Sequence, residues 1–136
     1  MREIGPVRQD SERGYRRWFQ DEYFDVFVWQ DARGRPIALQ LCYERDTAEG
    51  AISWSETDGF AHARVDGGAK QAKYGMTPIL RPDGAPPYFR IYKRFLDATA
   101  DWDPELRSFV LERLREYRRL LFGTRRTPRR RRKTQG

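Results

Sequence analysis

The residues best equipped for chemistry alternate along one segment of the chain. His62, Arg64 and Asp66 stand two positions apart, shortly after the turn-forming pair Asp58-Gly59. An arginine can hold a carboxylate or phosphate through two parallel hydrogen bonds, and a histidine can donate, accept or titrate near neutral pH. Side chains two apart in a strand share a face. This spacing therefore predicts one polar surface.

Two large aromatic residues are predicted to share that surface. Phe27 and Trp29 alternate with Val26 and Val28, and their rings could stack on a planar ligand. Aromatic rings beside short polar groups resemble the lining of a ligand pocket. The predicted ligand- or partner-binding set is Phe27, Trp29, Gln40, Ser53, Ser55, His62, Arg64 and Asp66, with Asp25 and Cys42 on the same face. The alternative is structural: the aromatic residues pack under the N-terminal arm or against a second copy, and the polar ones form surface hydrogen bonds or weak ion pairs.

The sequence contains few combinations of residues that are typical of a catalytic site. Ser53 or Ser55 with His62 and Asp66 supplies the residue types of a nucleophilic triad, but no nucleophile elbow accompanies them. Cys42 with His62 could form a thiolate pair, although a lone cysteine in a strand is more often a small packed residue. One His and one Cys cannot build a common structural zinc site within the chain. We therefore expect no metal and no cofactor, and favour a protein that is not an enzyme.

The net charge of +7 is confined to the C-terminal end. Residues 1–122 contain 20 basic and 20 acidic residues, and the last fourteen add basic residues alone. This polyanion-binding tail consists of Arg125, Arg126, Arg129, Arg130, Arg131, Arg132 and Lys133. Such a run attracts nucleic acid with salt-dependent affinity and without sequence preference; a solubilising tail with no partner is the alternative. Pro128 and the lack of apolar residues after Phe122 argue against an amphipathic membrane helix.

The first of two hairpins must position Phe27 and Trp29. Apolar residues alternate over 24–28 and again over 37–41, with the turn-forming sequence Asp-Ala-Arg-Gly at 31–34 between them. A four-residue loop over 31–34 predicts three cross-strand pairs: Val28 with Ile37, Val26 with Leu39, and Phe24 with Leu41. These six side chains then share the apolar face.

A second hairpin must position His62 and Arg64. Asp58-Gly59 between two alternating runs is a strong hairpin signal. A loop of two residues and a loop of four predict the same faces. Ile52, Trp54, Ala61, Ala63 and Val65 lie on the apolar face, and Ser53, Ser55, His62, Arg64 and Asp66 lie opposite.

Helical signals follow the strands. Pro86 and Pro87 suit a helix start before the apolar periodicity of 88–99, and Asp103-Pro104-Glu105 is typical of a second start. Gly123 suits its end. We also expect a short strand at 15–20, a flexible loop at 67–76 and a further short strand at 77–81.

Strands followed by helices indicate an α+β fold. We predict an antiparallel sheet of four to five strands, formed by two consecutive hairpins, with a C-terminal helical hairpin packed on one face. The domains are a flexible N-terminal arm (1–14), a single α+β domain (15–122) and a disordered basic tail (123–136).

Composition restricts the class further. The 136 residues suit one domain, and a single cysteine excludes an internal disulfide. No run approaches the about 20 apolar residues that span a bilayer, and no leader opens the chain. We expect a cytoplasmic protein with no membrane partner.

Three functions remain open. The first is a non-catalytic binding module that uses the helix-free sheet face, with the tail contacting nucleic acid. The second is a small-ligand protein or enzyme centred on His62 and Arg64. The third is a subunit that forms a homodimer through Phe27 and Trp29. The shortage of catalytic residue types favours the first.

Overall fold

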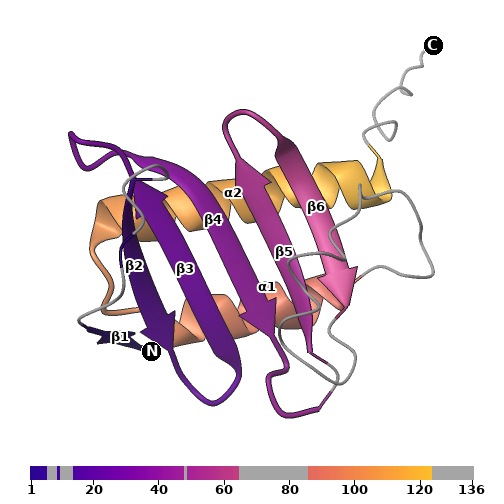
Figure 1. The fold of residues 1–136 in the computed structure, drawn as a ribbon. Helices are drawn as coiled ribbons and strands as arrows, with labels where there is room; N and C mark the ends of the chain where they lie inside the picture. Colours follow the sequence, from indigo (N-terminus) through magenta and orange to yellow (C-terminus); the bar gives the residue numbers. More distant parts are fainter. Residues whose placement is uncertain (6–8, 10–13, 48, 65–85, 124–136) are drawn as a thin grey trace, which may run out of the picture.

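The computed structural model describes residues 1–5, 9, 14–47, 49–64 and 86–123. It contains a six-stranded antiparallel sheet in which the strands lie in sequence order, followed by two helices. Both helices pack against the same face of the sheet, which leaves the other face free of helices (Figure 1). The predicted α+β class and the two hairpins are confirmed, and the sheet has more strands than the expected four or five.

The bounds of the elements are these: β1 Arg2–Ile4, β2 Tyr15–Gln20, β3 Phe24–Gln30, β4 Pro36–Tyr43, β5 Gly50–Ser55, β6 Gly59–Arg64, α1 Tyr88–Ala98 and α2 Pro104–Phe122. The expected loop at 67–76, the expected strand at 77–81 and the basic tail lie outside the described residues.

The start of the chain differs from the expected loose arm. Arg2–Ile4 pair with β2, so β2 is an interior strand. The Arg17 guanidinium donates to both carboxylate oxygens of Glu3 at 2.9 and 2.8 Å, and the N-terminal ammonium donates to the Ala98 carbonyl at 3.0 Å. The ion pair joins β1 to β2, and the ammonium holds the N-terminus against the end of α1.

The first hairpin has a different register from the predicted one. Val28 pairs with Leu39 rather than with Ile37, a shift of two residues. The closing pair Gln30–Pro36 leaves a five-residue loop, and an irregularity beside Trp29 adds one further residue on β4. The longer loop and the irregularity each shift β4 by one residue, so the total shift is two residues. An even shift leaves every side chain on its predicted face, and the predicted faces of both strands are therefore correct.

The second hairpin corrects the predicted faces. Its closing pair is Ser55 with Gly59, so the loop has an odd number of residues and β6 turns over relative to the prediction. Gly59 has a φ of 74°, the left-handed conformation typical of three-residue hairpin loops. His62 consequently pairs with Ile52 and lies on the helix-covered face, whereas Ala61 and Ala63 lie on the helix-free face.

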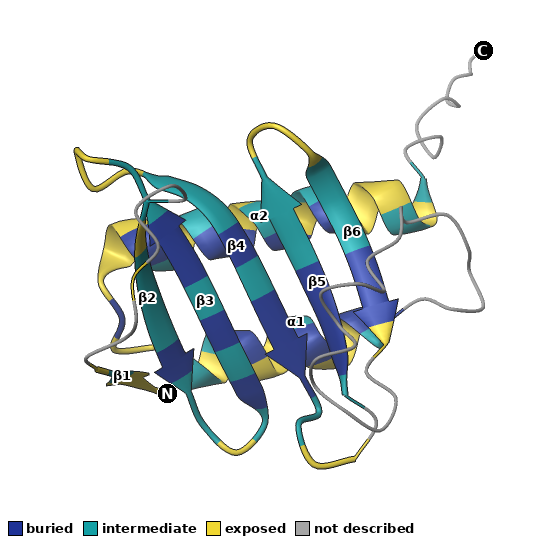
Figure 2. Cartoon of the chain, viewed as in Figure 1, coloured by how far each residue is buried: buried dark blue, intermediate teal, exposed yellow. Residues whose placement is uncertain are grey.

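The core lies between the sheet and the helices. Figure 2 shows buried and partly buried residues alternating along β3, as expected for a strand with one covered face. The apolar residues of the first hairpin are joined there by aromatic and aliphatic residues of both helices. Phe24 packs edge-on against Phe95 at 5.9 Å between ring centroids, and Trp102 packs on Phe19 at 4.4 Å.

The helix boundaries agree with the sequence signals. The Asp103 carboxylate accepts a hydrogen bond from the Leu106 amide at 3.0 Å, and Pro104 occupies the first helical position of α2. Gly123 follows α2 with a φ of 80°. Neither helix in the described part of the chain has the length and apolarity needed to cross a bilayer.

Candidate functional site

The helix-free face carries a stacked aromatic pair on β2 and β3. Trp18 and Phe27 are direct cross-strand partners, and their rings lie nearly parallel, 5.6 Å apart at an interplanar angle of 17°. Both are partly exposed. The guanidinium of Arg16 lies over the Phe27 ring at 5.7 Å. We call Trp18, Phe27 and Arg16 the aromatic platform.

Asp25 fixes the Trp18 ring in this position. One carboxylate oxygen accepts hydrogen bonds from the Trp18 indole and from the Gln20 amide, each at 2.8 Å. The other oxygen accepts from the Arg45 guanidinium, also at 2.8 Å. A platform whose ring is fixed before binding loses less side-chain entropy when a ligand stacks on it.

Polar groups border the platform on β4 and β5. Gln40 is the cross-strand partner of Phe27, and Ser53 is the partner of Gln40, so the three side chains form one row across the sheet. The Gln40 amide lies 3.5 Å from the Cys42 sulfur. An amide and a hydroxyl beside a ring can bond the edge of a planar ligand that stacks on it.

Parts of the same face are not accessible. Trp29 is only 7% exposed and contacts Phe27 at 6.4 Å between ring centroids. Cys42, Ala51 and Ala63 are also buried. Burial raises the pKa of the Cys42 thiol to about 11, so the reactive thiolate form is scarce at neutral pH.

The structure separates the residues that the sequence predicted as one site. Phe27, Trp29, Gln40, Ser53 and Ser55 lie on the helix-free face as predicted. His62 and Arg64 lie on the opposite face, and this corrects their predicted placement. Asp66 and the tail residues Arg125, Arg126, Arg129, Arg130, Arg131, Arg132 and Lys133 lie outside the described residues.

His62 belongs to a buried polar contact between the sheet and the helices. Its Nε2 lies 2.7 Å from the Tyr43 hydroxyl, and the two rings are stacked at 12°. Burial, together with the nearby positive charge of Arg64, lowers the pKa of His62 to about 4. Burial likewise raises the pKa of the Tyr43 hydroxyl. Both groups are therefore neutral at pH 7, and Ser53 and Ser55 on the other face cannot join His62 in a triad.

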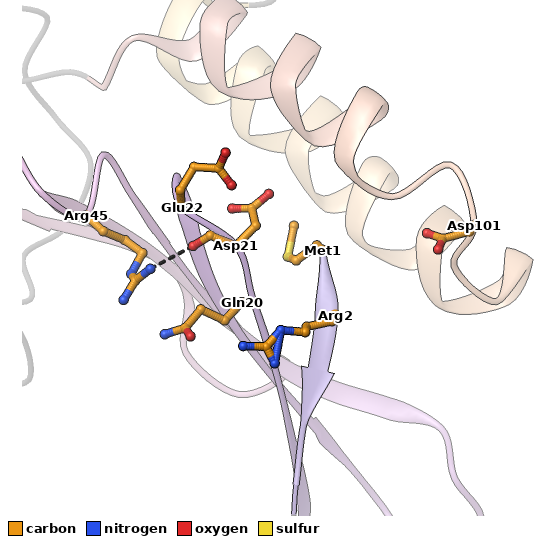
Figure 3. Close-up of a pocket in the computed structure, with 7 residues that line it drawn as sticks. All are labelled: Met1, Arg2, Gln20, Asp21, Glu22, Arg45 and Asp101. Atoms are coloured by element: carbon orange, nitrogen blue, oxygen red, sulfur yellow. Dashed lines mark hydrogen bonds between the residues drawn. The ribbon is translucent and has the colours of Figure 1, made fainter.

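A separate pocket of about 500 Å³ lies beside the β2–β3 turn. Figure 3 shows it opening between β1, this turn and the loop that precedes α2. Its lining mixes both charges: Met1, Arg2, Gln20, Asp21, Glu22, Arg45 and Asp101. The Arg45 guanidinium is already engaged by Asp25 and by the Asp21 carbonyl. The other charged side chains of the lining are three carboxylates and Arg2, so the pocket as a whole does not favour an anionic ligand.

Sequence reasoning missed Trp18 and Arg16. The alternation in Tyr15–Gln20 places Arg16, Trp18 and Gln20 on one face, and this signal was available. It is weakened because Arg17 occupies the other, helix-facing side, where an apolar residue is usual. Arg17 is tolerated there because it lies over the Phe19 ring at 5.1 Å and binds Glu3.

Neither the arrangement of possible metal ligands nor similarity to known proteins assigns a function to this site. Within the described residues, no group of three or more His, Cys, Asp or Glu side chains is arranged to hold a metal ion. No protein-family model matches the chain, and neither a curated protein nor a solved structure matches it significantly.

Proposed function

We propose that this protein is a non-catalytic binding module for single-stranded nucleic acid. Bases stack on the aromatic platform of the helix-free face, and the basic tail contacts the phosphate backbone. The observation that carries the proposal is the parallel Trp18–Phe27 pair, partly exposed on that face. Every base has a flat π-surface, so stacked aromatic side chains bind single strands with little sequence preference.

Charge supports the same ligand class. The platform includes Arg16, whose guanidinium lies over the Phe27 ring, and an arginine can stack on a base or hold a phosphate through two hydrogen bonds. Seven further basic residues lie in the tail. The tail alone would bind any polyanion, whereas the platform distinguishes unpaired bases from a duplex whose bases are already stacked.

The other two hypotheses receive less support from the arrangement. A small-ligand site centred on His62 and Arg64 cannot include Phe27 and Trp29, because these aromatic residues lie on the other face of the sheet. A homodimer through Phe27 and Trp29 has less aromatic surface to bury than the sequence suggests, because Trp29 is already buried within one chain.

The test is a binding titration with a fluorescein-labelled 20-nucleotide oligouridine, followed by anisotropy at several salt concentrations. Trp18→Ser should weaken binding by about fivefold or more, the loss expected for one stacked base. Tyr15→Ser is the matched control, because Tyr15 is an exposed aromatic residue on the same strand whose side chain lies on the opposite face.

Two results would overturn the proposal. One is equal affinity of wild type and Trp18→Ser, which would show that the sheet face does not contact the ligand. The other is equal affinity for the oligouridine and a duplex of the same length. Sedimentation at several protein concentrations tests the homodimer hypothesis independently of these binding results.

A further inference from the structure

A second exposed aromatic group lies where the two helices meet near the end of the described chain. α1 begins and α2 ends on the same side of the molecule (Figure 1). Phe89 and Phe122 stack there at 5.6 Å and 20°, and they are 60% and 50% exposed. The Arg118 guanidinium lies over the Phe89 ring at 5.5 Å. We call Phe89, Arg118 and Phe122 the helix-end patch.

Positive charge is concentrated around this patch. Arg115, Arg118, Arg119 and Phe122 recur at i, i+3, i+4 and i+7, which places them on one side of α2. All four are exposed. Within the described chain these three arginines form no ion pair, in contrast to Arg113, which contacts Glu112 and Glu116. Their charge is therefore available to a partner.

The start of α1 adds to the positive electrostatic potential around the patch. Its first turn contains no acidic residue, and no side chain caps its amides. The partial positive charge of a helix N-terminus is thus uncompensated beside Phe89. In the sequence the basic tail begins directly after α2, since Arg125 follows Phe122 by three residues.

These features select the partner. A second copy of the chain would bring like charges together and be repelled. An anionic membrane attracts lysine and arginine alike, but six of the seven basic tail residues are arginine, as are all three on the α2 stripe. Residues 123–136 contain no apolar side chain that would deepen insertion. Arginine combines bidentate phosphate binding with stacking on bases, and this favours nucleic acid.

We infer that the helix-end patch is a second base-stacking site for single-stranded nucleic acid, in which Phe89 and Phe122 stack on a base while the neighbouring arginines of α2 hold its flanking phosphates. This inference rests on the proposed function for its ligand class. It adds a contact that is separate from the aromatic platform, because the patch belongs to the helical layer and the platform to the opposite face of the sheet.

The experiment uses the full chain and the same labelled oligouridine. The double variant Phe89→Ser/Phe122→Ser is compared with wild type, with Tyr15→Ser as a control of similar exposure (56%) and with Trp18→Ser. All substituted side chains are at least partly exposed, and thermal melting checks that each variant is folded. We expect the double variant to bind at least fivefold more weakly. The slope of log affinity against log salt should be unchanged, because that slope reports phosphate contacts.

The outcomes separate the two proposals. If the double variant binds within twofold of wild type while Trp18→Ser is weakened, the inference is overturned and the proposed function stands. If the double variant alone is weakened, the inference stands and the sheet-face proposal falls. If no variant is weakened, or wild type does not bind, both fall. A loss of binding to vesicles of phosphatidylcholine and phosphatidylglycerol, with oligouridine binding unchanged, would make the patch a membrane contact and overturn the inference.

Discussion

His62 Nε2 lies 2.7 Å from the hydroxyl of Tyr43, beneath the helical layer and not on the helix-free face. This contact follows from the odd-length loop between β5 and β6. It removes the only histidine of the chain from any surface site and gives it a structural role. Its neutral form is required there, because a charged imidazole in a buried position lacks the solvation that it has in water.

The pH dependence of stability follows from this burial. The pKa of His62 is lowered to about 4 in the folded protein, against 6.5 for an ordinary histidine. The unfolded chain therefore binds a proton between these values while the folded chain does not. The stability that neutral, buried His62 contributes is fully present above pH 6.5. It is lost progressively as the pH falls toward 4, by up to about 1.4 kcal/mol of unfolding free energy per pH unit.

Urea unfolding at pH 7.5, 6 and 5 checks this expectation against His62→Gln. Other groups, such as Glu49, whose pKa is raised chiefly by burial, titrate in both proteins. The difference between the two slopes therefore isolates the histidine. Parallel slopes, or a histidine that titrates by NMR near 6.5 in the folded protein, would contradict the buried neutral form.

Gly50 is required by its cross-strand partner Tyr43. A Cβ at position 50 would lie 2.3 Å from the Tyr43 hydroxyl oxygen and 2.5 Å from the ring carbon that bears it. The ring cannot move easily, because it is buried and packed against His62. We expect Gly50→Ala to destabilise the fold by about 1–3 kcal/mol, as overpacked substitutions do. Gly5→Ala is the control, because nothing lies within 4 Å of its added Cβ; similar losses from both variants in denaturant unfolding would contradict this account.

Two buried tyrosine hydroxyls should respond oppositely to removal. The Tyr117 hydroxyl finds no hydrogen-bond partner among the described residues, whereas the Tyr88 hydroxyl donates to the Leu114 carbonyl at 2.8 Å. Tyr117→Phe should leave stability unchanged or raise it, because an unsatisfied buried hydroxyl is removed. Tyr88→Phe should lower stability by about 1 kcal/mol. The paired free energies of unfolding decide this, and a larger loss for Tyr117→Phe would reveal a partner for its hydroxyl.

Alternation and capping signals were sufficient for much of the fold. The apolar faces of β3 and β4 follow from period-two spacing. They were predicted correctly although the register was wrong, because the register differs from the predicted one by two residues. The start of α2 follows from Asp103, whose carboxylate caps the helix as its position suggests. These features depend on residues close together in the sequence, where local rules are strongest.

The candidate site was harder to predict because it depends on parity across a turn. The Asp58-Gly59 signal is compatible with loops of two, three or four residues. The observed three-residue loop, with Gly59 in the left-handed conformation, differs by one residue from either prediction and places His62 on the opposite face. The pairing of Trp18 with Phe27 joins two strands through a turn built by Asp21, whose carboxylate accepts from the Tyr23 and Phe24 amides. No alternation within either strand alone specifies that pairing.

The central claim is that bases stack on Trp18, and the indole N–H signals of the four tryptophans test it most directly. Trp18 donates its indole N–H to Asp25 on the helix-free face, whereas Trp54 packs against Phe109 and Trp102 against Phe95 under the helices. On titration of the isotope-labelled protein with oligouridine, the account predicts that the Trp18 signal shifts while the signals of Trp54 and Trp102 stay in place. Binding that leaves the Trp18 signal unmoved would contradict it.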